Sequence, residues 1–269
     1  MFSVIENIHK YSQSGRDKVS LSFDRILLLS ILAGFFIAFA AATSSTAAFG
    51  IQDAGLARLV TGLIFPFGLG MVMLCGAEIF TGNCLIIIPV LERTVKLKNM
   101  LCNWPKVYLF NLVGAMLIAA ACVFIGQLDS GDGALAVYTI RIAAAKCTLP
   151  FAGAIVSGIL CNILVCTAII SSLSTTDNVG KIAGAYIPVA FFVICGFEHS
   201  IANMYYIPAG LFAMMRPDYA ALALDAGLDV SGLTLGAFFL RNLLPVTLGN
   251  MIGGVGFGTL MWRSYSKSK

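Results

Sequence analysis

Six long apolar runs, separated by short charged stretches, dominate this sequence. Four of them carry no charged residue or histidine, one carries only Glu78, and one carries Glu198 and His199. Only 11% of all residues are charged, whereas a soluble domain carries roughly a quarter. About 20 apolar residues cross a bilayer as a helix, so the runs predict six transmembrane helices. They are residues 26–49, 59–91, 107–128, 147–176, 182–215 and 242–262.

The basic residues between these runs predict how the chain is oriented. An even number of spans places both termini on one side of the membrane. Twelve of the 17 Lys and Arg residues lie on that side, in the two tails and two loops. Lys and Arg accumulate on the cytoplasmic side, so we expect a multi-pass protein of the cell (inner) membrane with both termini cytoplasmic.

The chain ends are predicted to be short appendages of a single six-span channel domain, residues 26–262. Residues 1–25 show no cleavable signal peptide, and residues 263–269 read as a cytoplasmic tail. Four apolar side chains of the N-terminal segment recur at helical spacing: Phe2, Ile5, Ile8 and Tyr11. This spacing favours an amphipathic helix on the membrane surface. A helix packed against the pore mouth is the alternative.

The two halves of the chain repeat a pair of motifs in the same order. Residues 76–83 and 196–203 read G-x-E-x-x-x-x-N, and residues 107–114 and 246–253 read V-x-L-x-N-x-x-G. The repeat unit therefore contains three spans, at about 26–128 and 147–262. Because three is odd, the halves must insert with opposite orientations, as in many channels and transporters.

The second and fifth runs each exceed 30 residues. As straight helices they would measure roughly 50 Å against a hydrocarbon core of about 30 Å. Each contains the G-x-E-x-x-x-x-N motif, so we expect both helices to break there. Non-helical backbone at membrane depth persists only where it is buried in protein or lines a wet cavity. The breaks therefore predict a pore near the middle of the bilayer.

Ionisable residues inside a span are costly and indicate function. For Glu78 and Glu198 we favour a structural role, in which each carboxylate binds backbone N–H groups freed by the break or holds a partner segment; direct ligand contact is the alternative. His199 has Ile79 as its counterpart in the repeat, so symmetry does not require it. Its imidazole suits hydrogen-bond donation or proton transfer to an anion. Thr81 in the opposite broken helix is expected to face it. The alternatives are a core histidine held by Glu198 or a carbonyl, and a threonine bonded to its own helix.

Apolar and basic residues near the breaks suggest how a pore would select its solute. Large apolar side chains flank the breaks at Phe65, Leu69, Phe80 and Phe192. They are either core residues or an apolar constriction, where a desolvated ion is disfavoured. Lys146, just before the fourth run, either draws anions into a vestibule or extends to the membrane interface.

Residues 76–83, 196–204 and 242–254 resemble the formate/nitrite transporter family, and the likeness spans nearly the whole chain. The resemblance implies a homopentamer of six-span protomers with an aquaporin-like fold, each with its own pore and surrounded by membrane lipid. It implies that His199, Thr81, Asn162 and Lys146 line the substrate pathway. It also assigns Phe65, Leu69 and Phe192 to a cytoplasmic constriction and Phe80 and Val165 to a periplasmic one. Structural residues at the breaks are predicted to be Glu78, Glu198, Asn83 and Asn203.

Members of this family pass formate, nitrite or hydrosulfide. The run Phe80–Asn83 departs from the Ser/Thr-rich continuation of enterobacterial formate channels, which leans the prediction toward hydrosulfide. Hydrosulfide is nearly half protonated at neutral pH, so it needs the least help to cross apolar rings as the neutral species. Formate and nitrite stay open.

Three other kinds of protein agree less well with the sequence. An aquaporin-like channel for neutral solutes shares six spans and inverted repeats, but the paired Asn-Pro-Ala motifs are absent and no Asn-Pro occurs. An intramembrane enzyme is disfavoured because no HExxH or GxSxG pattern appears. A structural scaffold would leave the intramembrane ionisable residues unexplained. Neither a cofactor, a metal site nor nucleic-acid binding is predicted.

Overall fold

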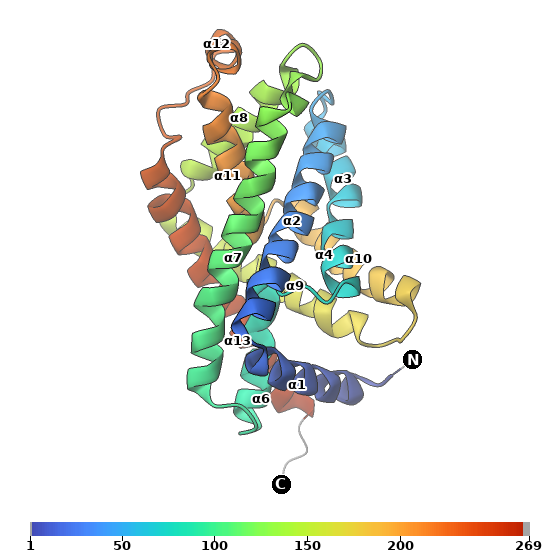
Figure 1. Cartoon of the computed structure of the whole chain (residues 1–269). Helices are drawn as coiled ribbons and strands as arrows, with labels where there is room; N and C mark the ends of the chain where they lie inside the picture. Colours follow the sequence, from blue (N-terminus) through green and yellow to red (C-terminus); the bar gives the residue numbers. More distant parts are fainter. Residues whose placement is uncertain (1, 266–269) are drawn as a thin grey trace.

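The computed structural model describes residues 2–265, which form helices and connections without a β-strand (Figure 1). Six of the helical segments are long and apolar enough to cross a membrane. The all-helical, six-span fold predicted from the sequence is thereby confirmed. The segments are α2 (Phe23–Ala48), α3 (Ala54–Ile64) with α4 (Pro66–Leu74), α7 (Leu97–Phe124), α9 (Phe151–Ser172), α10 (Asn178–Cys195), and η3 (Ala237–Leu243) with α13 (Leu244–Tyr265).

Shorter helices complete the chain. They are α1 (Val4–Ser20), α5 (Phe80–Asn83), η1 (Cys84–Ile86), α6 (Ile87–Leu91), η2 (Gln127–Asp129), α8 (Ala134–Cys147), α11 (Ser200–Met214) and α12 (Pro217–Asp225). Of the predicted C-terminal tail, residues 266–269 lie outside the described residues. The third span begins earlier than predicted, because α7 starts at Leu97 and includes Lys98 and Lys106. Lysine is a good helix former, so a charge that ends an apolar run does not end the helix.

The second and fifth runs break where their motifs predicted. Helix α4 ends at Leu74 and α5 begins at Phe80, while α10 ends at Cys195 and α11 begins at Ser200. Each break opens on a glycine with a left-handed backbone, Gly76 at φ +64° and Gly196 at φ +73°. Glycine adopts this conformation without a steric penalty, which explains the G that opens each motif.

One asparagine satisfies the backbone freed by the first break. The side-chain oxygen of Asn111 on α7 accepts a hydrogen bond from the Phe80 N–H at 2.9 Å. Its amide nitrogen donates to the carbonyls of Ser30, at 2.7 Å, and of Glu78, at 2.9 Å. Asn111 is fully buried, so it supplies the partners that water would otherwise supply.

Asn250 on α13 repeats this arrangement at the second break. It accepts from the Ser200 N–H at 2.9 Å and donates to the carbonyls of Gly158, at 2.8 Å, and Glu198, at 3.0 Å. The matching bonds agree with the two motif pairs in the sequence. The opposite insertion of the two halves stays a prediction.

Glycines bring two pairs of helices into close contact around these asparagines. A Cβ added at Gly114 of α7 would collide with the Ile31 carbonyl of α2. In the second half, a Cβ at Gly249 of α13 would collide with the Ile155 carbonyl of α9. Small residues permit such backbone approach in membrane helices, and here the approach brings Asn111 and Asn250 within reach of the breaks.

Helix α1 packs against the rest of the protein and does not stand free of it. It crosses the end of the molecule where α13 also ends (Figure 1). Ile8 and Tyr11 are buried. The Tyr11 hydroxyl donates to the Gly82 carbonyl at 2.7 Å, and Lys10 Nζ donates to the Leu173 carbonyl at 3.2 Å. Packing against the protein, one part of the alternative given above, is therefore observed, and the placement at a pore mouth stays a prediction.

Candidate functional site

The two breaks bring Thr81 and His199 together in the interior. Thr81 Oγ1 and His199 Nε2 are 3.0 Å apart, and both residues are buried. Thr81 follows the first break on α5, and His199 is the N-cap of α11 after the second break. The predicted facing of these side chains is thus observed, although they are far apart in the sequence.

Three contacts hold the His199 ring. Its Nδ1 accepts a hydrogen bond from the Ala202 N–H at 3.1 Å, so the side chain caps α11. The Phe192 ring stacks on it with centroids 5.8 Å apart. Because Nδ1 is an acceptor, the neutral imidazole carries its proton on Nε2. Nε2–H then donates to Thr81 Oγ1, which leaves the threonine hydroxyl proton free to donate elsewhere.

Asn162 lies beside this pair rather than facing it. Its amide nitrogen donates to the carbonyls of Thr81, at 3.2 Å, and Asn250, at 2.6 Å. Both donor hydrogens are therefore used, and its side-chain oxygen has no partner among the described residues. The contacts indicate that Asn162 positions Thr81, a more indirect place than the pathway contact expected from the sequence.

Three cavities follow one another through the centre of the protein. The largest, about 540 Å³, extends from His199 to Arg58 and Arg141. A second, about 260 Å³, opens beside Tyr11 and Lys18 of α1. Between them lies a space of only about 10 Å³. The central space shares Phe65, Phe192 and His199 with the large cavity and Ile79 with the second.

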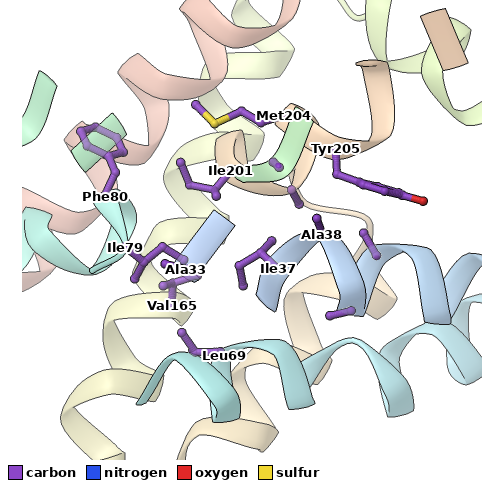
Figure 2. Packing of buried hydrophobic residues seen from close by; sticks show 14 of the residues in the cluster. Ala33, Ile37, Ala38, Leu69, Ile79, Phe80, Val165, Ile201, Met204 and Tyr205 are labelled. Carbon is purple, nitrogen blue, oxygen red and sulfur yellow. The ribbon is translucent and has the colours of Figure 1, made fainter. Parts of the chain in front are cut away.

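Apolar side chains surround the small central space. Ile37, Leu69, Ile79 and Val165 gather there in Figure 2, and Val189 completes the wall. An ion crossing this space loses most of its water, which is costly unless polar groups replace it. Among the described residues that line it, His199 is the one with a titratable side chain.

The structure disagrees with the predicted placement of four constriction residues. Phe65 and Phe192 line the large cavity, on the side away from α1, and not the cavity beside α1. The predicted cytoplasmic termini would place this cavity on the other side of the membrane, so the two predictions conflict. Phe80 lines none of the three cavities; it packs edge-on against Trp104 and Tyr108 and points away from the central group (Figure 2). Val165 lies with Leu69 at the centre, and so at neither mouth.

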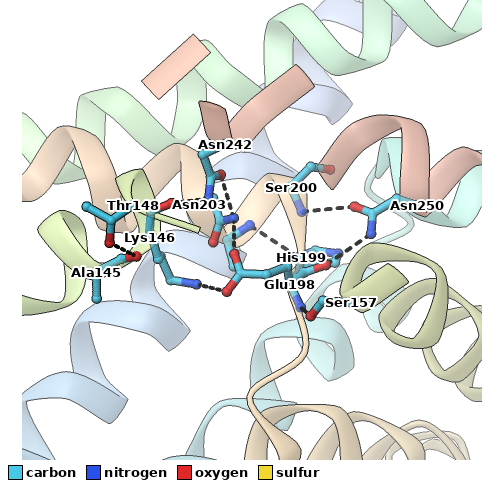
Figure 3. Close-up of polar contacts among 11 residues, drawn as sticks. Ala145, Lys146, Thr148, Ser157, Glu198, His199, Ser200, Asn203, Asn242 and Asn250 are labelled. Carbon is cyan, nitrogen blue, oxygen red and sulfur yellow. Dashed lines mark hydrogen bonds and ion pairs between the residues drawn. The ribbon is translucent and has the colours of Figure 1, made fainter. Parts of the chain in front are cut away.

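Lys146 is held in a buried polar network at the large cavity (Figure 3). Its Nζ lies 2.8 Å from Glu198 Oε1. The other carboxylate oxygen accepts from Asn203 at 2.6 Å, and Asn203 also donates to Asn242 at 2.7 Å. Asn242 in turn donates to the Lys146 carbonyl at 2.9 Å. Lys146 is therefore neither a free vestibule cation nor an interfacial residue.

The first half contains the same network around Lys18. Lys18 Nζ lies 2.6 Å from Glu78 Oε1. Asn83 donates to Glu78 at 2.8 Å and to Asn103 at 2.9 Å. Sequence reasoning missed Lys18 and Asn103, together with Asn111, Asn242 and Asn250. The repeated N in V-x-L-x-N was the signal for Asn111 and Asn250.

The contacts of the two glutamates match one of the two structural roles predicted for them. Glu78 and Glu198 accept from lysine and asparagine side chains, while the freed backbone groups at the breaks go to Asn111 and Asn250 and, for the Glu198 N–H, to Ser157. Each glutamate thus ties its break to the end of another helix, α1 or α8. This corresponds to the second part of the prediction, that the carboxylates hold a partner segment.

Comparison with known proteins places this architecture in a family. The formate/nitrite transporter profile matches residues 5–263. The chain belongs to the formate/nitrite transporter family. It is 36% identical to the "Probable formate transporter" of Methanothermobacter thermautotrophicus over 90% of this chain and 89% of that protein. It is also 36% identical to "Formate channel FocA" of Escherichia coli K12, over 84% of this chain and 81% of that protein.

Solved structures of the family share the fold. A "Pentameric formate channel with formate bound" superposes with a TM-score of 0.80 at 32% identity, over 91% of this chain and 98% of that one. An "FNT family ion channel" superposes with a TM-score of 0.83 at 28% identity, over 96% and 98%. The family consists of channels and transporters, so this chain is a multi-pass membrane transport protein and not an enzyme.

Proposed function

We propose that this protein conducts formate and related small monovalent anions of weak acids through a pore in each protomer. The main observation in support of this proposal is the Thr81–His199 pair, a polar contact of 3.0 Å beside the apolar central space. The relatives named above as formate channels support formate as the first anion. Nitrite and hydrosulfide are proposed as further solutes.

Conduction follows from the donors at the centre. A dehydrated anion entering the apolar space meets the Nε2–H of neutral His199 and the Thr81 hydroxyl, which rotate from bonding each other to bonding the anion. Hydrogen bonds to charged groups are worth roughly 1.5–3 kcal/mol each, so two such donors offset part of the desolvation cost. Protonating His199 would place a donor against the Ala202 N–H, so we favour hydrogen-bond donation over proton transfer.

The protein is further proposed to be a homopentamer in the cell membrane. The similarity to a solved pentameric channel supports this assembly. The excess of Lys and Arg beside α1 and the loop before α7 supports cytoplasmic termini.

Uptake of labelled formate into proteoliposomes tests the proposal. We expect saturable uptake that nitrite and hydrosulfide reduce by competition and that chloride leaves nearly unchanged. A hydrosulfide branch would appear as faster hydrosulfide than formate flux in the same vesicles. Liposome swelling with glycerol serves as the control for a neutral-solute pore. Glycerol passage without formate uptake would reject the proposed function.

A further inference from the structure

The large cavity and the cavity beside α1 lie at equivalent places in the two repeats, but the charges of their lining residues differ. The cavity beside α1 holds Lys18 and Glu78, which neutralise each other. In the other cavity, Lys146 is neutralised by Glu198, but Arg58 and Arg141 also line the wall. Two positive charges therefore remain on one side and none on the other.

Neither arginine has an acidic partner within residues 2–265. Arg58 projects from α3 and Arg141 from α8, at the end of the molecule opposite α1 (Figure 1). The Arg58 guanidinium approaches the left-handed backbone at Gly196, immediately before Glu198 and His199. Asp53 is the acidic residue nearest to Arg58 along the chain. One of its carboxylate oxygens caps α3 by accepting from the Leu56 N–H. The two guanidinium groups are thus open to an external anion.

This cavity accommodates a larger anion than the central space can pass. A volume of about 540 Å³ lies within the range of roughly 300–1,000 Å³ typical of small-molecule sites. The space beyond it measures only about 10 Å³. Guanidinium groups bind carboxylate and phosphate oxygens through paired N–H donors. Gln52, Thr61 and Tyr206 add polar groups to the same wall.

We propose that Arg58 and Arg141 form a binding site for small dianionic oxyanions, such as dicarboxylates or hydrogen phosphate, which bind in the large cavity and obstruct the pathway without crossing it. The site is separate from the conduction proposed above, because binding requires no passage. A bound dianion would occupy the space between the outer solution and His199. Monovalent anions entering from that side would then compete with it.

Titration calorimetry of the purified detergent-solubilised protein tests the site directly, at constant ionic strength to hold screening fixed. We expect succinate and hydrogen phosphate to bind, and acetate to bind at least tenfold more weakly. The double variant Arg58→Gln/Arg141→Gln should weaken dianion binding at least tenfold. Arg241→Gln is the matched control, because Arg241 is exposed on η3 and lines none of the three cavities.

Formate uptake supplies the second readout. Externally added succinate should inhibit uptake in the wild type, and the half-inhibitory concentration should rise at least tenfold in the double variant. Binding of either dianion that depends on both arginines supports the site even if formate is not conducted. The site would be excluded by absence of dianion binding at millimolar concentrations, or by equal binding in the wild type and a double variant that elutes as the same oligomer. If the double variant does not assemble, the single variants Arg58→Gln and Arg141→Gln take its place, each expected to weaken binding.

Discussion

Replacing His199 with asparagine is expected to reduce formate uptake about 10- to 100-fold while leaving the protein folded. Asparagine is a favourable N-cap residue, so its side-chain oxygen can still accept from the Ala202 N–H. The ring nitrogen that reaches Thr81 is lost. Removing one donor to a buried anion costs roughly 1.5–3 kcal/mol, and each 1.36 kcal/mol is about tenfold in rate. Initial uptake rates in proteoliposomes at matched protein content measure the effect.

Two threonine variants provide the accompanying comparison. Thr81→Val removes the hydroxyl of the central pair and should also reduce uptake. Thr167→Val is the control, since Thr167 on α9 bonds only the Ile163 carbonyl of its own helix. Wild-type rates in assembled His199→Asn and Thr81→Val proteins would mean that the central pair does not stabilise the anion.

The second large effect is expected from Asn250→Leu, which should prevent assembly of a stable protein. Leucine has a similar size but bonds neither the Ser200 N–H nor the carbonyls of Gly158 and Glu198. Each buried group left without a partner costs roughly 1–3 kcal/mol. Three such losses approach the whole stability of an ordinary protein, about 5–15 kcal/mol. Asn111→Leu should act alike at the first break.

Heating followed by size-exclusion chromatography in detergent measures this loss. Asn250→Asp should fall between the wild type and Asn250→Leu, because it keeps the acceptor for the Ser200 N–H but loses both donors. Asn99→Leu is the matched control at an exposed position on α7. An Asn250→Leu protein that melts with the wild type would show that water or neighbouring groups satisfy the break.

The breaks and the central pair were accessible to sequence reasoning because each leaves a local signal. A span of more than 30 apolar residues is too long for the membrane, and the repeated glycine and glutamate mark where it breaks. His199 stood out because its counterpart, Ile79, is apolar. The repeated asparagines of V-x-L-x-N were visible in the sequence too. Their role could not be predicted, because their bonds to Phe80 and Ser200 join segments that are distant in the sequence.

The wrong predictions concern residues whose role depends on how deep in the membrane they lie. Phe65 was assigned to the cytoplasmic side, although the predicted topology starts the second span at the opposite side and reaches Phe65 before Leu69 and the break. The predicted topology already contained this information. Lys18 was missed for another reason: it belongs to α1, outside every apolar run, and its bond to Glu78 appears only once α1 packs under the first break.

The central claim is that anions cross each chain through the narrow space lined by Leu69 and Val165. Val165→Phe tests it most directly, because a phenyl ring at this position would fill a space of only about 10 Å³. Val156→Phe, on the exposed face of the same helix, is the control for added bulk. We predict that formate uptake in Val165→Phe falls to the level of protein-free liposomes, while the Val156→Phe protein conducts normally. Undiminished uptake by a correctly assembled Val165→Phe protein would contradict the claim and place the route outside this space.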